Sequence, residues 1–368
     1  MTLSETFNIF YTKHLFPLEL FQQLSTIKEN SPWHREDSVL IHTNTVIHEL
    51  YNRVDNNSSS DFADIASLFA AAFHDVGKYY TQSIKSIEPN GLPRLSFSAH
   101  EQSSATHWQD YAIKNWDLIS SSFPVINQDK KFIWLVSWMI EFHLPYKIKK
   151  PDKLKNLYNT TSIMDVTKAF GNLLLSDAAG RISDNFDVNY SEVETWVNNY
   201  NSQSTQISSS LTSEKICYVL IGASGSGKST YVEQLKNQQD ISVFSLDQLR
   251  LDYYSSDYDT AYKMSVDDKD FFTTSSNNFL SMVKNSNNKN IVVDNMNLTR
   301  KRRNFYITAA RCQKYKIVGV LFLNTLETLL ERQQTRMDKH LSEEVVRLHY
   351  SVLQQPSYGE FDLIQIVG

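Results

Sequence analysis

Cysteine is scarce in this chain of 368 residues, which contains only Cys217 and Cys312. Two cysteines cannot build the disulfide framework of a small secreted domain, so we expect a reducing, intracellular compartment. No apolar run approaches the ~20 residues that span a bilayer. The N-terminal segment lacks the basic start and the small-residue cleavage site of a signal peptide. These absences predict a soluble cytoplasmic protein without a membrane partner.

An excess of positive charge is also absent, because 36 basic residues face 41 acidic ones and the net charge is −5. This balance excludes a protein that binds nucleic acid through its charge as a whole, although it leaves a local basic groove open. Hydrophobic residues make up 41% of the chain. The chain can therefore bury cores, and its length predicts two or three domains.

Residues 195–213 contain no charged residue, no glycine and no proline. Their Asn, Ser, Gln and Thr side chains have little to bury, which is typical of a linker. Residues 1–213 hold 17 basic and 23 acidic residues, whereas residues 214–368 hold 19 basic and 18 acidic residues. Eight of the ten histidines lie within residues 1–213. We therefore predict two domains of different chemistry, 1–200 and 214–368, joined by a linker at 201–213.

The first half shows the periodicity of helices, with apolar residues three or four positions apart and no convincing strand alternation. The five longest segments of this kind are residues 37–54, 61–75, 100–116, 130–143 and 162–181. We expect this half to be all-α.

The second half alternates short β-branched strands with helices. The expected strands are residues 215–224, 241–247, 290–296 and 316–324, with only helices after the last of them. Strands that alternate with helices in this way predict an α/β domain with a parallel sheet.

A phosphate-binding motif follows the first of these strands. The segment GASGSGKST satisfies G-x-x-x-x-G-K-[ST] at every position. Its glycines allow backbone N–H groups to surround phosphate oxygens, while Lys228 reaches the β/γ phosphates and Ser229 binds Mg²⁺. The candidate nucleotide-binding residues are Gly222, Ser224, Gly225, Ser226, Gly227, Lys228, Ser229 and Thr230. We expect ATP or another NTP here, rather than an empty strand-to-helix turn.

Acidic and basic residues downstream suggest phosphoryl transfer. Asp247 and Asp294 each end an expected strand, where a carboxylate can serve as a general base or help to organise Mg²⁺. The alternative for either residue is a helix cap. Arg332 and Arg336 lie four positions apart, on one face of a helix. Such a pair can close over a transferring phosphoryl group, although it is more often a solvated face.

Residues 215–368 resemble the kinase domain of phage and bacterial polynucleotide 5′-kinases, through GASGSGKST, LDQLR, VVDNMNLTRKRR and the tail that begins with ERQQTR. The resemblance implies that Asp247 deprotonates a 5′-hydroxyl and that Arg250 holds the neighbouring 3′-side phosphate. The residues implied to contact the transferring phosphates are Lys228 and the lid arginines Arg332 and Arg336. The basic run at residues 300–303 is either a polynucleotide track or a solvated helix face.

Histidine and aspartate residues are spaced along the first half in a pattern that suits metal binding. The ordered set is His42, His74, Asp75, His100, His143 and Asp177. Imidazole and carboxylate groups suit borderline transition metals. A single histidine is more often a buried structural residue, so the argument depends on the whole set. His107 competes with His100 for one position. We interpret the remaining histidines as structural: His14, His48, His340 and His349.

The segments HDVGK, AHE, EFH and SDAAGR resemble the HD phosphohydrolase superfamily, an all-α, metal-dependent fold that acts on phosphate esters. The resemblance implies a first metal ion held by His42, His74, Asp75 and Asp177. It implies a second site formed by His100 and His143, with Asp75 bridging, and because family members differ in whether this site is filled, one or two ions are expected. The metal would be Mn²⁺, Ni²⁺, Co²⁺ or a similar ion. The candidate contacts to the substrate phosphate are His34, Lys78 and Arg181, with exposed polar residues as the alternative interpretation.

The order of the two halves resembles the bacterial and phage bifunctional HD-Pnk end-healing enzymes. That resemblance implies phosphorylation of 5′-hydroxyl ends and removal of 2′,3′-cyclic, 2′- or 3′-phosphate ends, which prepares broken RNA or DNA for a partner ligase. Two alternatives stay open: a small-molecule phosphohydrolase fused to a nucleoside-type kinase, and a nucleotide-regulated sensor. Asp247 and Arg250 argue against the sensor, because a regulatory site needs no base beside an acceptor.

Overall fold

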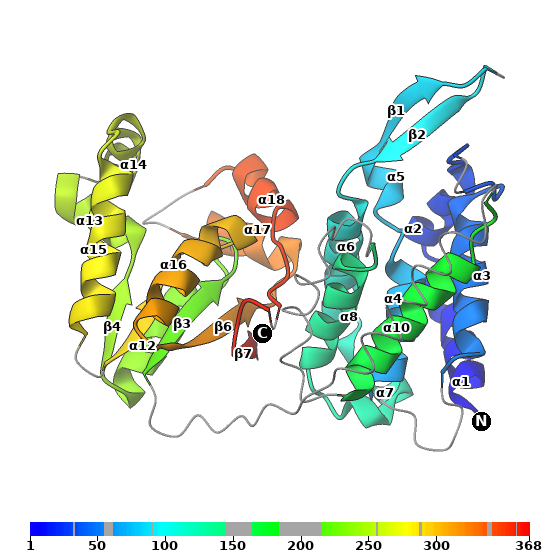
Figure 1. Cartoon of the computed structure of the whole chain (residues 1–368), viewed down its shortest axis with the longest axis horizontal. Coiled ribbons are helices and arrows are strands. Elements are labelled where there is room, and N and C mark those ends of the chain that lie inside the picture. The colour runs from blue at the N-terminus through cyan, green and yellow to red at the C-terminus, as the bar shows by residue number, and fades with distance from the viewer. Residues whose placement is uncertain are drawn as a thin grey trace. The chain divides into compact units, whose positions relative to one another are not determined.

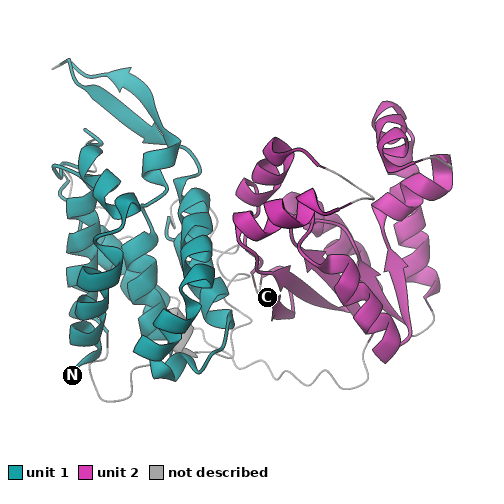
Figure 2. Ribbon diagram, turned by 180° about the vertical axis from the view of Figure 1, so that it is seen from behind, with its two compact units in different colours: residues 1–208 teal, residues 209–368 magenta. Residues whose placement is uncertain are grey.

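The computed structural model describes residues 1–31, 34–54, 62–89, 91–144, 164–183, 215–254, 257–286, 289–336, 341–357 and 359–368. The chain divides into two compact units, unit 1 at residues 1–208 and unit 2 at residues 209–368 (Figure 2). This division falls within the predicted linker, whose residues 201–213 lie outside the described residues.

Unit 1 consists mainly of helices (Figure 1). Its helices are α1 (Leu3–Phe10), α2 (Glu19–Gln22), α3 (Val39–Tyr51), α4 (Phe62–Phe73), α5 (Lys78–Thr81), α6 (His100–Lys114), α7 (Trp116–Ser122), α8 (Lys131–Glu141) and α10 (Met164–Ala179). Three short helical turns accompany them, at Tyr11–Leu15, Gln23–Thr26 and Pro124–Ile126.

Helix α4 is the centre of unit 1. It packs against α3, α6, α8 and α10, and all of its residues from Ala63 to Phe73 are buried. The Phe69 ring lies 5.1 Å from the rings of both Phe7 and Trp108. All residues of α4 except Asp64 and Ser67 are apolar, and each large apolar side chain removed from water contributes about 1.5–3 kcal/mol. The core therefore fixes the position of α4, including its C-terminal end.

A β-hairpin in unit 1 shows that the all-α expectation for residues 1–200 is wrong in this region. Strands β1 (Gln82–Ile87) and β2 (Pro93–Phe97) pair antiparallel. Strand β1 is exposed along its whole length, so it lacks the apolar alternation of a half-buried strand. The sequence signal that does point to the hairpin is Asn90-Gly91, the strongest short hairpin turn pair.

Unit 2 is a parallel sheet with helices, which confirms the α/β expectation. The strand order is β4-β5-β3-β6-β7, and every neighbouring pair is parallel. The strands are β3 (Ile216–Ile221), β4 (Ile241–Phe244), β5 (Asn290–Val293), β6 (Lys316–Phe322) and β7 (Leu363–Val367). The helices are α12 (Lys228–Gln238), α13 (Leu246–Tyr254), α14 (Tyr258–Asp267), α15 (Phe271–Asn285), α16 (Arg300–Cys312), α17 (Leu326–Gln334) and α18 (Glu343–Ser351).

Strand β7 corrects the expectation of helices alone after residue 324. It adds an edge strand beside β6, and only the second of its five residues is fully buried. An edge strand of five residues, LIQIV, carries too short a pattern to be told from the end of a helix.

Arg303 of α16 is fully buried and makes an ion pair with Glu360, shortly before β7. Its Nε and Nη2 atoms donate to the two carboxylate oxygens over 2.8 and 3.0 Å. Its Nη1 donates to three backbone carbonyls, those of Asn297, Leu298 and Gln354. The side chain thereby ties α16 to the loop after β5 and to the C-terminal segment.

This burial corrects one interpretation of the basic run at residues 300–303. A polynucleotide track made by all four side chains is wrong, because Arg303 faces the interior. Only Lys301 and Arg302 of the run are exposed.

Replacing Arg303 should destabilise unit 2 without affecting unit 1. Arg303→Met removes the guanidinium group that pairs with the half-buried Glu360 carboxylate and donates to three backbone carbonyls, so the free energy of unfolding should fall by about 1–3 kcal/mol. All six tryptophans lie before residue 197, so tryptophan fluorescence follows unit 1 while far-ultraviolet circular dichroism follows both units. In urea titrations, we expect the part of the dichroism change that comes from unit 2 to occur at a lower urea concentration than in the wild type. The midpoint of the fluorescence transition should not change. The exposed Arg302→Met is the control, and equal stability of the two variants would contradict this role.

Candidate active sites

Helix α4 carries His74 and Asp75 to the middle of unit 1, because both residues follow it directly. The chain then passes close to the start of α6. A Cβ atom on Gly77 would lie 2.2 Å from the carbonyl oxygen of His100, so only glycine permits this approach. The Gly77 N–H also donates to Ser104 Oγ over 2.8 Å. The backbone thereby holds His100 beside Asp75.

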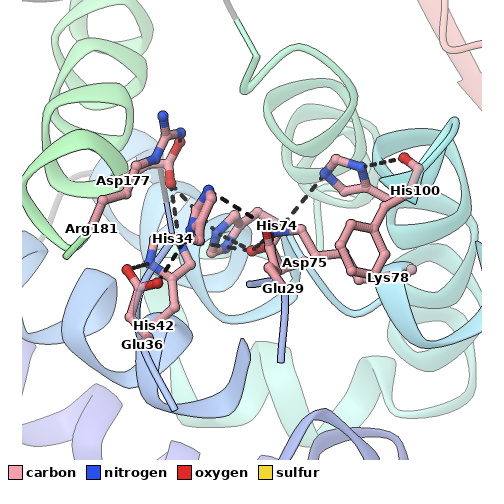
Figure 3. Close-up of polar contacts among 12 residues, drawn as sticks. Glu29, His34, Glu36, His42, His74, Asp75, Lys78, His100, Asp177 and Arg181 are labelled. Atoms are coloured by element: carbon pink, nitrogen blue, oxygen red, sulfur yellow. Dashed lines mark hydrogen bonds and ion pairs between the residues drawn. The ribbon is translucent and has the colours of Figure 1, made fainter. Parts of the chain in front are cut away.

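All six predicted metal ligands meet at one buried place in unit 1. They come from α3, from the segment after α4, from the start of α6, from the segment after α8 and from α10. They are His42, His74, Asp75, His100, His143 and Asp177, each at most 6% exposed. Figure 3 shows His42, His74 and His100 around the Asp75 carboxylate, and Asp177 beside His42.

The two oxygens of Asp75 face two different groups of ligands. Asp75 Oδ2 lies 3.3 Å from His74 Nε2 and 3.7 Å from His42 Nε2. On the other side, Asp75 Oδ1 lies 3.4 Å from His100 Nε2 and 3.9 Å from His143 Nε2. Within the described ranges, both groups place their ligand atoms close enough together to hold a metal ion. This is the arrangement expected of a carboxylate that bridges two ions.

Asp177 lies beside the first of these groups. Its Oδ1 atom lies 3.1 Å from His42 Nε2 and 3.8 Å from His74 Nε2. Asp177 also makes an ion pair with Arg181, one helical turn later.

The backbone orients the four imidazole rings. Each Nδ1 lies within hydrogen-bond distance of a carbonyl oxygen, which can only accept, so Nδ1 carries the hydrogen and Nε2 faces Asp75. The acceptors are Gly180 for His42 (3.3 Å), Ala71 for His74 (2.8 Å), Phe97 for His100 (3.0 Å) and Ile140 for His143 (2.6 Å). Nε2 of His74 and Nε2 of His100 are buried and make no hydrogen bond among the described residues. These buried nitrogen atoms fit a metal ion.

Electrostatics favours a cation at this site. Burial alone would raise the pKa of Asp75, but His74 and Lys78 lower it well below its usual value. Burial would likewise lower the pKa of His42, yet its contacts with Asp177 and Glu36 raise it to about 9. Burial lowers the pKa of His143 well below its usual value, so this ring is neutral and able to ligate. Surroundings that attract a proton to His42 attract a metal ion as well.

The three predicted phosphate contacts lie beside the cluster but are more buried and more paired than exposed polar residues would be. Lys78 is only 4% exposed, lies 2.8 Å from Asp75 Oδ2 and pairs with Glu29. His34 lies between two carboxylates, 3.9 Å from Glu29 and 3.5 Å from Glu36. Sequence reasoning missed both glutamates. Glu36 could have been found from its position two residues after His34, whereas Glu29 carries no local signal.

A cavity of about 630 Å³ opens onto the cluster. Four of the predicted metal ligands line it: Asp75, His100, His143 and Asp177. The three predicted phosphate contacts line it as well: His34, Lys78 and Arg181. A small phosphate ester fits a space of this size and chemistry.

His107, the competitor of His100, lies outside the cluster. Its ring stacks on Tyr80 with 4.1 Å between the ring centroids. His340, interpreted as structural, lies outside the described residues.

The phosphate-binding motif of unit 2 joins the end of β3 to the start of α12. Gly225 and Gly227 have φ angles of 82° and 97°, which only glycine adopts readily. Lys228 Nζ donates to the carbonyl oxygens of Gly222 and Ala223 over 2.9 and 2.7 Å. The lysine ammonium group therefore lies at the loop, as binding of the β/γ phosphates requires.

The predicted lid arginines also reach this loop. Arg332 Nη1 donates to the Gly225 carbonyl over 3.0 Å, and Arg336 Nη1 donates to Ser224 Oγ over 3.3 Å. Gln333 makes a further contact with Ser224 Oγ, from Nε2 over 3.3 Å, which sequence reasoning missed. Residues far apart in the sequence thus surround one phosphate site.

Asp247 and Arg250 are joined by an ion pair that the sequence does not predict. Arg250 Nη1 donates to Asp247 Oδ1 over 2.7 Å, and Arg250 Nε donates to Ser265 Oγ over 2.9 Å. Arg250 is buried and packs against the Tyr262 ring. The Tyr258 hydroxyl also donates to Asp247 Oδ1, over 3.2 Å. Asp247 stands in the first turn of α13, just beyond β4, and its carboxylate is oriented by two donors.

Asp294 follows β5 directly, as predicted. Its N–H donates to the carbonyl oxygen of Phe244, the last residue of β4, over 2.8 Å. It therefore lies at the carboxyl edge of the sheet, beside the segment that leads to Asp247.

Comparison with known families agrees with this view of unit 2. Residues 218–356 match the family model of an AAA domain, and the match lies wholly within unit 2. Together with the parallel sheet, it makes unit 2 a P-loop kinase-like domain. Such a domain implies an enzyme of the kinase type that uses ATP or another NTP with Mg²⁺. A comparison with curated proteins gives no match to the chain.

The described helices were also compared with the length and polarity that a bilayer demands. None of them is both long and apolar enough to cross a membrane.

Metal binding should depend on His42 and not on His48, its exposed neighbour on α3. We expect His42→Ala to weaken Mn²⁺ binding at least ~10-fold in calorimetric titration, because it removes an oriented ligand. His48→Ala is the matched control and should bind as the wild type does. A proton and a metal ion compete for His42, whose pKa is about 9, so affinity should rise as the pH increases from 6 to 8. Equal binding by both variants would contradict the assignment.

Proposed function

We propose that the chain is a bifunctional end-healing enzyme, with an HD-type phosphohydrolase in unit 1 and a polynucleotide 5′-kinase in unit 2. The observation that carries the proposal is the buried Asp75 carboxylate, whose two oxygens face separate groups of oriented imidazoles. A purely structural core has no use for two buried imidazole nitrogens that make no hydrogen bond within the described ranges. The kinase-like domain in the same chain supplies the second activity.

In unit 1, the proposed substrate is a nucleic-acid end that carries a 2′,3′-cyclic, 2′- or 3′-phosphate. Bound transition-metal ions would activate a water molecule and neutralise phosphate charge. Asp75 and the imidazoles would hold these ions, while Lys78 and Arg181 place positive charge at the cavity wall. Their ion pairs with acidic residues keep both cations in fixed positions. A phosphate that enters the cavity would therefore meet oriented charges.

In unit 2, the proposed acceptor is the 5′-hydroxyl of a polynucleotide. Asp247 takes the proton as the 5′ oxygen bonds to the γ-phosphorus and the bond to the ADP oxygen breaks. Arg250 and Tyr258 hold the Asp247 carboxylate in place for this role. Lys228, Arg332 and Arg336 would exchange their present contacts with the loop for contacts with the phosphates.

The two proposed activities are complementary. Breakage of RNA often leaves a phosphate on the 3′ side and a hydroxyl on the 5′ side, whereas a ligase requires the opposite ends. One chain with both activities would prepare both ends, so we propose a ligase as a functional partner and the cytoplasm as the location. A hydrolase and a kinase of small nucleotides would predict equal activity on mononucleotides and on oligonucleotide ends.

The two activities should be separable. Lys228→Ala removes the ammonium group at the phosphate loop and should abolish 5′-phosphorylation, while hydrolysis of 3′-end phosphates stays near the wild-type rate. Asp75→Ala removes the carboxylate between the two groups of ligands and should do the reverse. Both variants are assayed as the full chain, on one oligonucleotide with a 5′-hydroxyl and a 2′,3′-cyclic phosphate. Loss of both activities in either folded variant would contradict the two-site proposal.

Asp247 should be needed for phosphoryl transfer. Asp247→Asn keeps an oxygen for Arg250 but cannot take a proton, so turnover should fall by ~10²–10⁴-fold with little change in ATP affinity. Asp252→Asn changes an exposed acid on the same helix and should have no effect. Each variant is assayed on an oligonucleotide and on a nucleoside without a 3′-phosphate. If wild-type protein phosphorylates the nucleoside equally well, the small-molecule alternative is correct.

A further inference from the structure

The β1–β2 hairpin extends beyond the helices of unit 1 (Figure 1), and its residues Lys85 and Arg94 line the cavity. Backbone contacts fix β2 to the segment that carries Glu29. The Leu95 N–H donates to the Glu29 carbonyl over 3.3 Å, and Asn30 Nδ2 donates to the Pro93 carbonyl over 3.0 Å. The hairpin is therefore held at the wall of the proposed active site, although β1 is exposed along its length.

The hairpin and the residue that follows it supply one wall of this cavity. The lining residues of this wall are Lys85, Arg94, Leu95, Ser96, Phe97 and Ser98. The Phe97 carbonyl also accepts from Nδ1 of His100, so the end of β2 touches the metal-binding cluster itself. One continuous element thus connects the cluster to the solvent.

Lys85 and Arg94 differ from the other cations that line the cavity. Lys78 and Arg181 are balanced by Asp75 and Asp177. Within the described part of unit 1, the side chains of Lys85 and Arg94 have no ion pair or hydrogen bond to an acidic group. Their positive charges are therefore available to an anionic ligand.

A β-bulge supports a functional role for Lys85. The strand register passes from the Ile84–Leu95 pair to the Ser86–Arg94 pair, which leaves Lys85 without a cross-strand partner. A bulge of this kind changes the direction of a side chain and is common beside active sites. Here it adds a second cation to the cavity wall that already holds Arg94.

We propose that the β1–β2 hairpin is a nucleic-acid-binding arm, in which Lys85 and Arg94 bind backbone phosphates of the strand whose 3′ end enters the cavity. The inference rests on the proposed phosphohydrolase function of unit 1 and deepens it, because it names the residues that bind the strand beyond its terminal phosphate.

The position of the arm favours a polynucleotide over a mononucleotide. A mononucleotide carries its phosphate only where the metal-binding cluster, Lys78 and Arg181 already supply contacts. A strand of six residues extends ~20 Å, so β1 reaches well beyond a single nucleotide. Ile84 and Ile87 on either side of Lys85 are 68% and 64% exposed, and they offer apolar surface to unstacked bases. The backbone phosphates of a single nucleic-acid strand would contact both Lys85 and Arg94.

The test compares the double variant Lys85→Ala, Arg94→Ala with the wild-type full chain in the presence of Mn²⁺. The substrates are a ten-nucleotide strand with a 2′,3′-cyclic phosphate end and bis(p-nitrophenyl) phosphate, a small phosphodiester. We expect KM for the strand to rise at least ~10-fold with kcat nearly unchanged, and hydrolysis of the small diester to be unaffected. The slope of log(kcat/KM) against log[salt] should fall in magnitude by about 1.4, which corresponds to two lost phosphate contacts on a single strand.

Two further variants serve as controls. Lys13→Ala, Lys131→Ala removes two positive charges from exposed positions that do not line the cavity, and it should behave as wild type. Lys85→Gln, Arg94→Gln keeps longer side chains, so it repeats the test if the alanine pair is unstable.

The outcomes distinguish failure of the arm from failure of the proposed function. If the wild type hydrolyses both substrates and the double variant keeps the same KM and salt slope on the strand, the arm is wrong and the phosphohydrolase stands. If the double variant hydrolyses both substrates more slowly than the wild type by the same factor, the two residues act within the catalytic site and the proposed arm is again wrong. If the wild type hydrolyses neither substrate, the proposed function and the arm fail together.

Discussion

The structure of unit 1 depends on how one buried carboxylate, that of Asp75, is compensated. An ion removed from water must be paired and hydrogen-bonded, or it destabilises the fold. Asp75 is only 2% exposed, and Lys78 and the imidazoles around it provide that compensation. Each imidazole is in turn held by a backbone carbonyl, so the backbone at helix ends and in loops orients the rings around the Asp75 carboxylate. The burial of α4, which ends directly before His74 and Asp75, fixes the position of the carboxylate.

The two units present different chemistry to phosphate. Unit 1 offers imidazole and carboxylate groups that suit transition metals, whereas unit 2 offers a glycine-rich loop, a lysine and two arginines. The net charge of −5 does not reveal this arrangement, because basic side chains lie at both sites together with the acidic residues that pair with them. Overall charge is thus a poor guide to what such a chain binds, and local placement decides it.

The sequence predicted those features that consecutive residues determine. The phosphate loop requires eight residues in a row, and the buried helix α4 is apolar apart from Asp64 and Ser67, so both could be recognised. Residues that act through long-range contacts were missed. Glu29 matters because it pairs with Lys78, which lies 49 positions later in the sequence. Arg303 can be buried because the distant Glu360 pairs with it. The hairpin was missed because an exposed arm has no core pattern, although Asn90-Gly91 marked its turn.

The central claim is that the Asp75 carboxylate lies between two metal ions. Anomalous diffraction from crystals of the full chain grown with Mn²⁺ tests it most directly. We predict two anomalous peaks, one beside Oδ2 among His42, His74 and Asp177, and one beside Oδ1 between His100 and His143. Asp75→Asn crystals should lose both peaks or show them strongly weakened. Full-length protein crystallised with Mn²⁺ that shows no anomalous peak beside Asp75 would contradict the claim.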